Sequence, residues 1–248
     1  MKILTSKLPK RTRENPKLKL FYERYYRGCK VASRLGPLIE NYLDRTYDAL
    51  TYACGMQNKT FVFRLDLRFP DDMEPNSMHA GNDYLSFFLH AFEIQLLALR
   101  REHVSHIHRA NFRYVWCREQ KDSDKPHYHL LILLNGNVFH QLGSSDASAL
   151  GRYQDNTLIH AAIRAWGWAL SRPTHMMKGL VEIPKKWEQG RRTNKYFHCM
   201  LHRNDPDIFA EVMYVASYLC KYYSKPLGQR IHCFDASKKP TRWRERAR

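Results

Sequence analysis

The amino-acid sequence predicts an α+β fold in which helices flank a central antiparallel sheet. Segments with strand and helix patterns are intercalated along the chain and do not form separate blocks. Residues 61–69 alternate apolar and charged side chains, which is typical of a strand. Residues 112–117 and 127–134 are two further strand-like segments joined by a polar turn, and this order indicates an antiparallel hairpin.

The first 55 residues are expected to form a basic arm followed by a helix, as an N-terminal extension of the fold. Lys and Arg are dense over residues 1–34, and roughly the first fifteen residues are expected to be a mobile arm. A helix is predicted over residues 38–53, and Gly55 lies where a C-cap glycine would end it. The helical spacing is carried by Leu38, Tyr42, Leu43, Tyr47 and Leu50.

The strand over residues 61–69 is expected to be half-buried. Its apolar side chains share one face, and Arg64, Asp66 and Arg68 share the other, because side chains alternate along a strand. The apolar run over residues 130–134 instead fits a strand that is buried on both faces. The sheet is therefore expected to place that second strand at its centre.

The remaining elements follow from hydrophobic periodicity and from Gly and Pro punctuation. The main domain is expected to span residues 56–237, and residues 238–248 are expected to form a basic tail. In chain order, its other elements are a loop over 70–83, a helix over 84–101, a loop over 143–154, a helix over 157–170, a strand over 179–184, a basic loop, a strand over 195–201, a helix over 205–223 and a strand over 230–234.

The charge balance favours a nucleic-acid partner. Lys and Arg number 41 against 24 Asp and Glu, which gives a formal net charge of +17, and 15 Tyr and 5 Trp accompany them. A basic surface interleaved with aromatic rings suits nucleic acid, because cations contact phosphates and rings contact bases. The alternatives are a basic but inert surface or a surface for acidic lipid, and the sequence has no amphipathic basic helix for the latter.

Targeting and cysteine patterns indicate a cytoplasmic protein with no membrane partner. No stretch approaches the ~18 apolar residues that a membrane span needs, and the basic N-terminus lacks the apolar region of a signal peptide. The 6 cysteines form no CxxC pair, so their thiols are expected to be reduced.

A pair of histidines opens the central strand. His127 and His129 project from one face of a strand, so their imidazoles can converge on one ion. Glu119 lies at the end of the partner strand of the hairpin, where its carboxylate can reach both rings. Two imidazoles and a carboxylate with open positions would hold a divalent ion such as Mg²⁺ or Mn²⁺ beside a phosphate oxygen. The alternative is that both histidines are merely polar residues at a strand end.

A competing histidine pattern, His106-Ile107-His108 with His103 nearby, lies between the long helix and the hairpin. It has no apolar strand behind it and no acidic partner strand. We therefore expect these histidines to lie at the surface or to contact phosphate rather than to bind metal.

A second group of reactive residues lies near the end of the last predicted helix. Tyr214 and Tyr218 are one helical turn apart and Lys221 follows, so the three side chains are expected to share a face. A phenol has a pKa near 10, and a neighbouring ammonium group favours the phenolate, which is the stronger nucleophile. The alternative is an aromatic stripe packed in the core with a solvated lysine.

The two groups together resemble the HUH endonucleases of rolling-circle replication. The similarity is greatest to the gene II-type replication initiators of filamentous phages and prophages. The first strand differs from the family pattern, because Arg64-Leu65-Asp66-Leu67 stands where threonine-rich sequences are common, and the role of Asp66 is left open. The motifs that carry the resemblance are Tyr114 to Gln120, Lys125 to His129, Asn135, Trp166 and Ala216 to Lys221.

The resemblance implies a ferredoxin- or RRM-like palm and a metal held by His127, His129 and Glu119. It also implies that Tyr218 attacks a phosphodiester of single-stranded or hairpin origin DNA, which forms a 5′-phosphotyrosyl link and frees a 3′-hydroxyl for priming. Tyr214 would be the second nucleophile. Lys221 would orient the phosphate, and host helicase and polymerase are the expected partners. The basic residues expected to contact DNA are Arg64, Arg68, Arg118, Arg191, Arg192 and Lys225.

Three other classes of protein are alternatives to the HUH nuclease. A histidine-triad phosphohydrolase requires a third histidine where this chain has Leu131, and a tyrosine recombinase uses an Arg and His constellation rather than a metal-binding strand. Both are therefore disfavoured. A non-catalytic basic DNA-binding protein is the main alternative to the nuclease.

Overall fold

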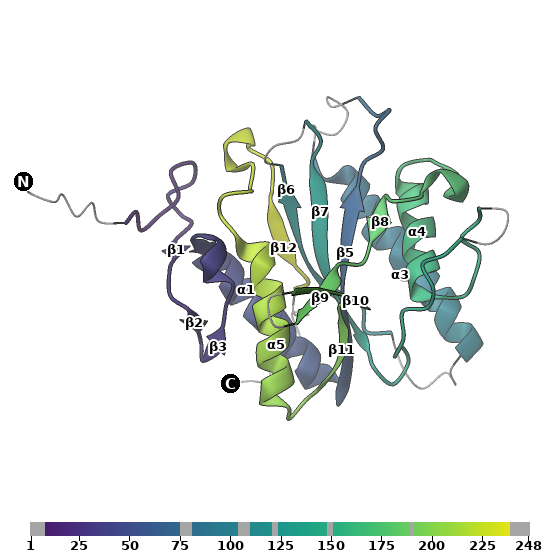
Figure 1. Cartoon of the computed structure of the whole chain (residues 1–248), viewed down its shortest axis with the longest axis horizontal. Helices are drawn as coiled ribbons and strands as arrows, with labels where there is room; N and C mark the ends of the chain where they lie inside the picture. Colours follow the sequence, from purple (N-terminus) through teal and green to yellow (C-terminus); the bar gives the residue numbers. More distant parts are fainter. Residues whose placement is uncertain are drawn as a thin grey trace, which may run out of the picture.

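A six-stranded antiparallel sheet is the centre of the structure (Figure 1). The structure is a computed structural model, and it describes residues 8–74, 81–103, 110–120, 124–147, 151–188 and 191–238, without the side chains of residues 35, 100–103, 187, 188 and 192. The sheet consists of β5 (Lys59–Arg68), β6 (Arg113–Glu119), β7 (His127–Asn135), β8 (Val181–Glu182), β11 (His198–His202) and β12 (Phe234–Ala236). Its order is β11-β5-β7-β6-β12, and β8 pairs with the other end of β5.

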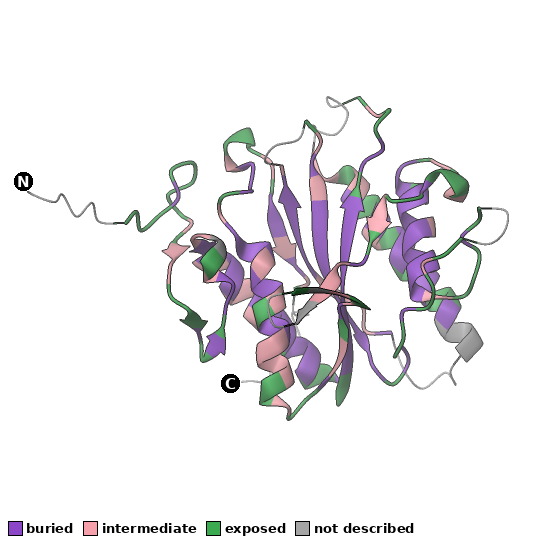
Figure 2. Ribbon diagram, viewed as in Figure 1, coloured by how far each residue is buried: buried purple, intermediate pink, exposed green. Residues whose placement is uncertain are grey.

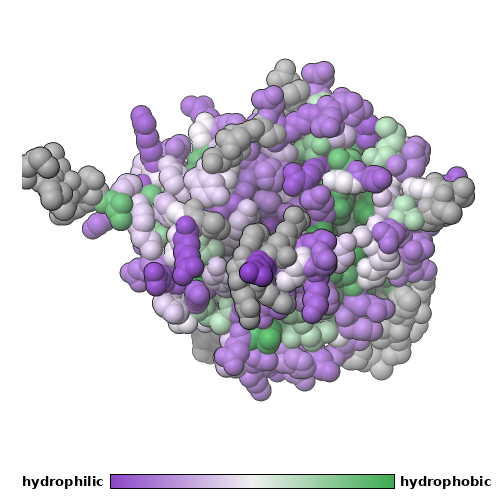
Figure 3. Space-filling model, in the orientation of Figure 1, coloured by the Kyte–Doolittle hydropathy of each residue, from purple (hydrophilic) through white to green (hydrophobic). Residues whose placement is uncertain are grey.

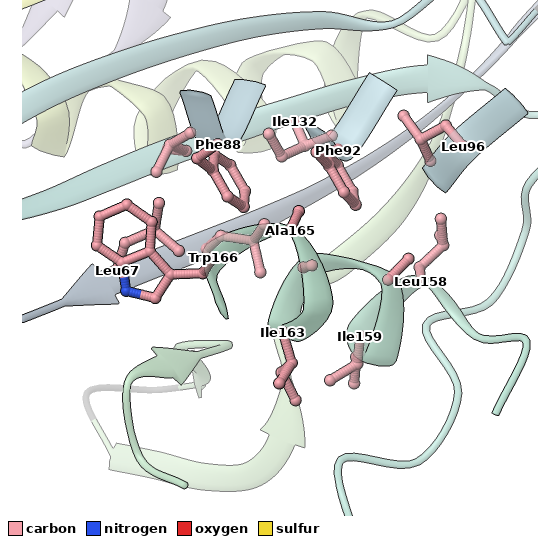
Figure 4. Packing of buried hydrophobic residues seen from close by; sticks show 14 of the residues in the cluster. Leu67, Phe88, Phe92, Leu96, Ile132, Leu158, Ile159, Ile163, Ala165 and Trp166 are labelled. Carbon is pink, nitrogen blue, oxygen red and sulfur yellow. The ribbon is translucent and has the colours of Figure 1, made fainter. Parts of the chain in front are cut away.

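Over the described residues, four α-helices cover the two faces of this sheet, and they are α1 (Glu40–Met56), α3 (Asp83–His103), α4 (Leu158–Ala169) and α5 (Pro206–Ser217). Helices α3 and α4 pack on one face around Phe88, Phe92 and Trp166 (Figure 4). Helices α1 and α5 pack on the other face. The predicted mixed fold, a central antiparallel sheet flanked by helices, is confirmed. None of the described helices is both long and apolar enough to cross a membrane.

Strand alternation divides the sheet between two hydrophobic cores. Phe63 and Ile132 belong to the core under α3 and α4, whereas Val62 and Leu133 belong to the core under α1 and α5. Because α1 shares this second core, the boundary expected near residue 55 does not separate two cores. Toward the start of β7 the second face changes from apolar to polar, and the candidate site lies at this end.

The predicted hairpin is confirmed, since β6 and β7 pair antiparallel with Glu119 opposite His127. The prediction of a half-buried β5 is wrong. Arg64 and Asp66 are only 8% and 9% exposed, and Figure 2 shows the central strands buried along most of their length. The charged face of β5 is covered because the chain around Tyr218 crosses it, which no local pattern could indicate.

The N-terminal region differs from the predicted arm and helix. Helix α1 begins at Glu40, because Leu38 and Ile39 form β4 (Leu38–Ile39) paired with β1 (Leu20–Phe21). Gly55 lies inside α1, whose C-cap is Gln57, so the expected glycine cap is wrong. Between these strands, β2 (Tyr25–Tyr26) pairs with β3 (Cys29–Lys30). Residues 1–7 of the expected mobile arm lie outside the description, whereas Thr12 is buried.

The helix that bears the tyrosines ends earlier than predicted. Helix α5 begins as expected, with Asp205 accepting a hydrogen bond from the Ile208 amide, but it stops at Ser217. The Ser217 hydroxyl donates to the Tyr214 carbonyl and accepts from the Ala32 amide, which ties the helix end to the N-terminal strands. A single 3₁₀ turn, η3 (Tyr218–Cys220), follows, and Lys221 continues in extended backbone that bridges Leu38.

The segment predicted as a basic loop is a β-hairpin. Strands β9 (Lys185–Glu188) and β10 (Arg191–Tyr196) pair antiparallel and lie over the α5 side of the sheet (Figure 1). The predicted strands on either side are shorter than expected or shifted. Only Val181–Glu182 of residues 179–184 is strand. The predicted strand over residues 195–201 is divided, since β10 ends at Tyr196 and β11 begins at His198. The last predicted strand, over residues 230–234, is also shifted and begins at Phe234, after Arg230 adopts left-handed backbone at the end of a 3₁₀ turn.

Candidate metal and tyrosine site

The candidate site is assembled by three neighbouring strands. His127 and His129 lie at the start of β7, Glu119 ends β6, and Asp66 lies near the end of β5. Strand register sets Glu119 opposite His127 and Asp66 opposite His129. Since all four belong to the face covered by α5, a two-residue period on each strand is enough to bring their side chains together.

Glu119, His127 and His129 form a cluster whose ligand atoms lie within 4.8 Å of one another. The Oε2 atom of Glu119 lies 3.3 Å from Nε2 of His129 and 3.9 Å from Nε2 of His127. The prediction that the hairpin brings the carboxylate beside both imidazoles is therefore confirmed. Two imidazole nitrogens and one carboxylate oxygen form a donor set that fits a divalent ion.

Asp66 orients His129 in this cluster. Its Oδ1 atom lies 2.6 Å from Nδ1 of His129, and the Arg64 guanidinium contacts both groups at 3.0 and 3.2 Å. A hydrogen bond from Nδ1 to this carboxylate directs Nε2 toward Glu119 and His127, as outer partners do in carboxylate–histidine–metal sites. Burial raises the pKa of Asp66, but the His129 hydrogen bond and charge and the nearby Arg64 outweigh it, so the net shift is downward.

Replacing Asp66 with asparagine is expected to weaken divalent metal binding about 10- to 100-fold, the usual cost of losing such a partner. The amide is nearly isosteric but carries no charge to favour the Nδ1–H form of His129. Calorimetric titration with Mn²⁺ measures the change, and Asp207→Asn, at an exposed position of α5, is the matched control. An Asp66→Asn protein with wild-type affinity would exclude this role.

The protonation states suit a metal ligand set. Burial, with the charge of His129, lowers the pKa of His127 to about 4, so this imidazole is neutral near pH 7 and its lone pair is free to coordinate. Burial raises the pKa of Glu119, but the contact with His129 and the ammonium groups of Lys225 and Lys221 lower it far below its usual range. The carboxylate is therefore ionised.

Two buried lysines hold this carboxylate. Lys225 Nζ lies 2.7 Å from Glu119 Oε1, and Lys221 Nζ lies 3.2 Å from Oε2. Their side chains are 0% and 2% exposed. In this structure Lys225 is a core ion-pair partner, not the DNA contact that the sequence predicts. The Lys221 ammonium is turned away from solvent because Lys221 has left the helical path.

Tyr218 packs against His129 of the cluster. Its ring centre is 5.6 Å from that of His129 and nearly perpendicular to it. The Lys221 ammonium lies 3.4 Å from the centre of the Tyr218 ring, and the Arg64 guanidinium lies 4.9 Å from it, so two cations hold the aromatic ring in place. The turn at the end of α5 that carries Tyr218 therefore packs against the metal-ligand cluster at His129.

Tyr214 precedes Tyr218 by one turn and is 41% exposed. Lys30 of β3 lies 5.8 Å from the centre of its ring. Both tyrosines line one large cavity of about 1390 Å³, which also includes His129, Arg64 and Asp66. Sequence spacing predicts that Tyr214 and Tyr218 share a face, but it does not place Lys221 beneath the Tyr218 ring.

The predicted DNA contacts fall into different environments. Arg64 and Arg68 line the cavity, and Arg191 is exposed on β10. Arg118 is 0% exposed and donates to Asn82 and Tyr128 under the opposite face, so in this structure it supports the core and does not contact DNA. The Arg192 side chain and the competing histidine motif at residues 106–108 lie outside the description, as does the side chain of His103. Cavity-lining cations that the sequence did not single out are Lys30, Arg34 and Lys178.

Fold and site together define an α+β protein with a candidate Glu–His–His metal centre under a tyrosine. Residues 21–237 match the YagK/YfjJ C-terminal domain family, and the chain belongs to this family. It is 24% identical over 216 residues to the uncharacterized protein YfjJ of Escherichia coli (strain K12), covering 83% of this chain and 98% of YfjJ. It is also 24% identical over 219 residues to the uncharacterized protein YagK of the same strain, covering 82% and 94%. No solved structure matches the chain.

Proposed function

We propose that this protein is a metal-dependent single-strand DNA endonuclease and strand transferase of the HUH type, which starts rolling-circle replication. The observation that carries the proposal is the position of Tyr218, whose ring lies 5.6 Å from His129 above the Glu119–His127–His129 cluster. The central sheet would correspond to the palm of an HUH fold, with the histidine strand β7 between β5 and β6.

The cluster has the chemistry that such a reaction needs. Glu119, His127 and His129 would hold a divalent ion, which when bound supplies Lewis-acid polarisation of a phosphate oxygen. Asp66 orients His129, and Lys225 fixes the second oxygen of Glu119, so the three ligand atoms are held before any ion or substrate binds. A fixed ligand set is expected to place the phosphate reproducibly under the tyrosine.

Tyr218 is proposed as the first nucleophile. Its phenolic oxygen would form a bond to phosphorus as the bond from phosphorus to the 3′-oxygen breaks. The phenol loses its proton, and the released 3′-oxygen gains one to become a hydroxyl. One phosphodiester is exchanged for another, so the reverse attack by a 3′-hydroxyl rejoins the strand. Tyr214, on the same cavity, would serve as the nucleophile for the second cut.

Charge supports DNA as the substrate. The chain carries a formal net charge of +17, and its cavity is lined by basic residues from several elements. The face that holds the cavity is largely hydrophilic (Figure 3). Contacts between basic side chains and phosphates provide most of the affinity of such a protein for a DNA strand. Single-stranded or hairpin origin DNA, with host helicase and polymerase acting after the nick, would be the partners.

One observation favours a second candidate, a non-catalytic DNA-binding protein. Lys221 and Lys225 already neutralise Glu119, so the buried polar cluster is balanced by charges of the chain itself. Lys221 also contacts Oε2, the oxygen that faces both imidazoles, so an ion would compete with this ammonium. In the binding-protein alternative, the cluster only stabilises the sheet.

A covalent-transfer assay distinguishes the two candidates. Wild-type protein is incubated with Mn²⁺ and a labelled pool of random-sequence single-stranded DNA, and covalent adducts are counted after denaturing electrophoresis. The adduct is expected to disappear in Tyr218→Phe and to persist in Tyr214→Phe, because the Tyr218 ring packs against His129 whereas Tyr214 is 41% exposed beside Lys30. If neither wild type nor variant forms an adduct or cleaves the pool while both bind it equally, the binding-protein candidate replaces the nuclease.

A further inference from the structure

We propose that the wall of the cavity formed by α4, β8 and the end of β10 is a subsite for unstacked bases of single-stranded DNA, and that a base stacks on the ring of Tyr196. This inference rests on the proposed function, because it describes how the same cavity would hold its strand. Tyr196 ends β10, lines the cavity and packs, partly buried, against the core under α4.

The cavity changes character along its length. Near Tyr218 the lining of the cavity is polar and includes Arg64, Asp66 and His129. Toward α4 and β8 it becomes apolar, and hydrophobic atoms are visible between hydrophilic ones on this side of the molecule (Figure 3). The apolar lining residues on this side are Tyr153, Ile159, Ile163, Met177, Val181, Ile183 and Tyr196.

A basic rim borders this apolar wall. Four acids line the cavity. Asp66 is paired with Arg64 and His129, Glu182 contacts Arg68, and Glu211 contacts Lys186. The fourth, Asp146, accepts a hydrogen bond from the Ser144 hydroxyl. The cations therefore outnumber the acids that they neutralise. The cations that line the cavity outside the tyrosine site are Lys30, Arg34, Arg68, Lys178, Lys185 and Lys186.

An apolar wall beside a cationic rim matches the chemistry of a single strand. Phosphates would lie along the rim, and base faces, which are exposed only when the bases are unpaired, would contact the wall. A duplex hides its base faces in its own stack and would leave the wall uncovered. The volume of about 1390 Å³ exceeds the ~300–1,000 Å³ typical of small-molecule pockets, which favours several linked nucleotides over one small ligand.

The wall is held in shape before any strand binds. His160 is 0% exposed, its Nδ1 accepts a hydrogen bond from the Asp155 amide, and its Nε2–H donates to the Asp146 carbonyl. The segment before α4 is therefore tied to the helix. The Tyr196 hydroxyl lies 2.9 Å from the Ser145 hydroxyl, which ties the hairpin to the same segment. A ring fixed in this way loses little conformational entropy when a base stacks on it.

The test measures binding without cleavage. Fluorescence anisotropy with labelled oligo(dT) is carried out in EDTA on a Tyr218→Phe parent. Tyr196→Ala is expected to weaken binding about ten-fold, within the range for loss of one base–aromatic stack. Tyr196→Phe keeps the ring and is expected to bind within about two-fold of the parent. Tyr25→Ala, which removes a 60% exposed tyrosine outside the cavity, is the matched control.

An abasic oligomer of the same length separates stacking from phosphate contact. Against this probe, Tyr196→Ala is expected to bind as well as the parent, because no base is left to stack. Equal binding of oligo(dT) by Tyr196→Ala and the parent, or an equal loss on both probes, would overturn the subsite. Thermal unfolding of each variant excludes global destabilisation as the cause. Because no step requires cleavage, this result is independent of whether Tyr218 forms an adduct.

Discussion

The double variant His127→Ala/His129→Ala is expected to lose divalent metal binding and DNA cleavage while keeping most of its salt-sensitive DNA affinity. The two imidazoles supply two of the three donors of the cluster, so the ion would be left with Glu119 alone. Affinity for the strand comes instead from phosphate contacts by cations that lie along the cavity. Mn²⁺ titration, the covalent-transfer assay and anisotropy at several salt concentrations measure the three properties separately.

The matched control is His90→Ala/His140→Ala, which removes two exposed histidines outside the site. This control should bind metal and form the adduct like wild type. If the double variant at positions 127 and 129 still forms the adduct at the wild-type rate, the start of β7 has no part in the reaction. If the variant at positions 127 and 129 loses metal binding and DNA affinity together, the two properties depend on the same residues. That result would contradict the separation that the structure implies.

Replacing Glu119 with leucine is expected to lower the free energy of unfolding by about 3–5 kcal/mol, the usual cost of breaking a buried ion pair by removing one partner. The side chains of Lys221 and Lys225 are buried, and both would lose their common carboxylate. Urea unfolding measures the change. In Glu119→Leu/Lys225→Met, one of the two stranded charges is also removed, so part of the stability is expected to return.

Glu182→Gln is the control for this prediction. Its carboxylate is paired with Arg68 at the surface, where the side chains are about half exposed, and such pairs contribute about 0–1 kcal/mol. A Glu119→Leu protein as stable as Glu182→Gln would show that the buried lysines find other partners. In wild type, the lowered pKa of Glu119 implies stabilisation that is present above the ordinary glutamate pKa near 4.3 and is lost as acid protonates the folded carboxylate.

The geometry of the histidine cluster could be predicted from sequence because it depends on local rules. Strand alternation places His127 and His129 on one face, and a hairpin brings Glu119 opposite His127. The start of α5 near residue 205 is likewise a local feature, and it was predicted correctly.

Contacts between distant segments could not be predicted in the same way. Asp66 meets His129 only through the register of β5 against β7, and Lys225 reaches Glu119 only because the chain leaves the helix after Ser217. The hairpin formed by β9 and β10 was also missed, since its charged sequence lacks apolar alternation and its pairing depends on packing over the sheet.

The measurement that tests the account most directly is mass-spectrometric identification of the residue that carries DNA after wild-type protein reacts with the random-sequence single-stranded pool and Mn²⁺. A 5′-phosphonucleotide on Tyr218 is the expected result, because this ring packs against His129 of the Glu119–His127–His129 cluster. An unmodified protein, or a nucleotide carried only by a residue other than Tyr218, would contradict the account.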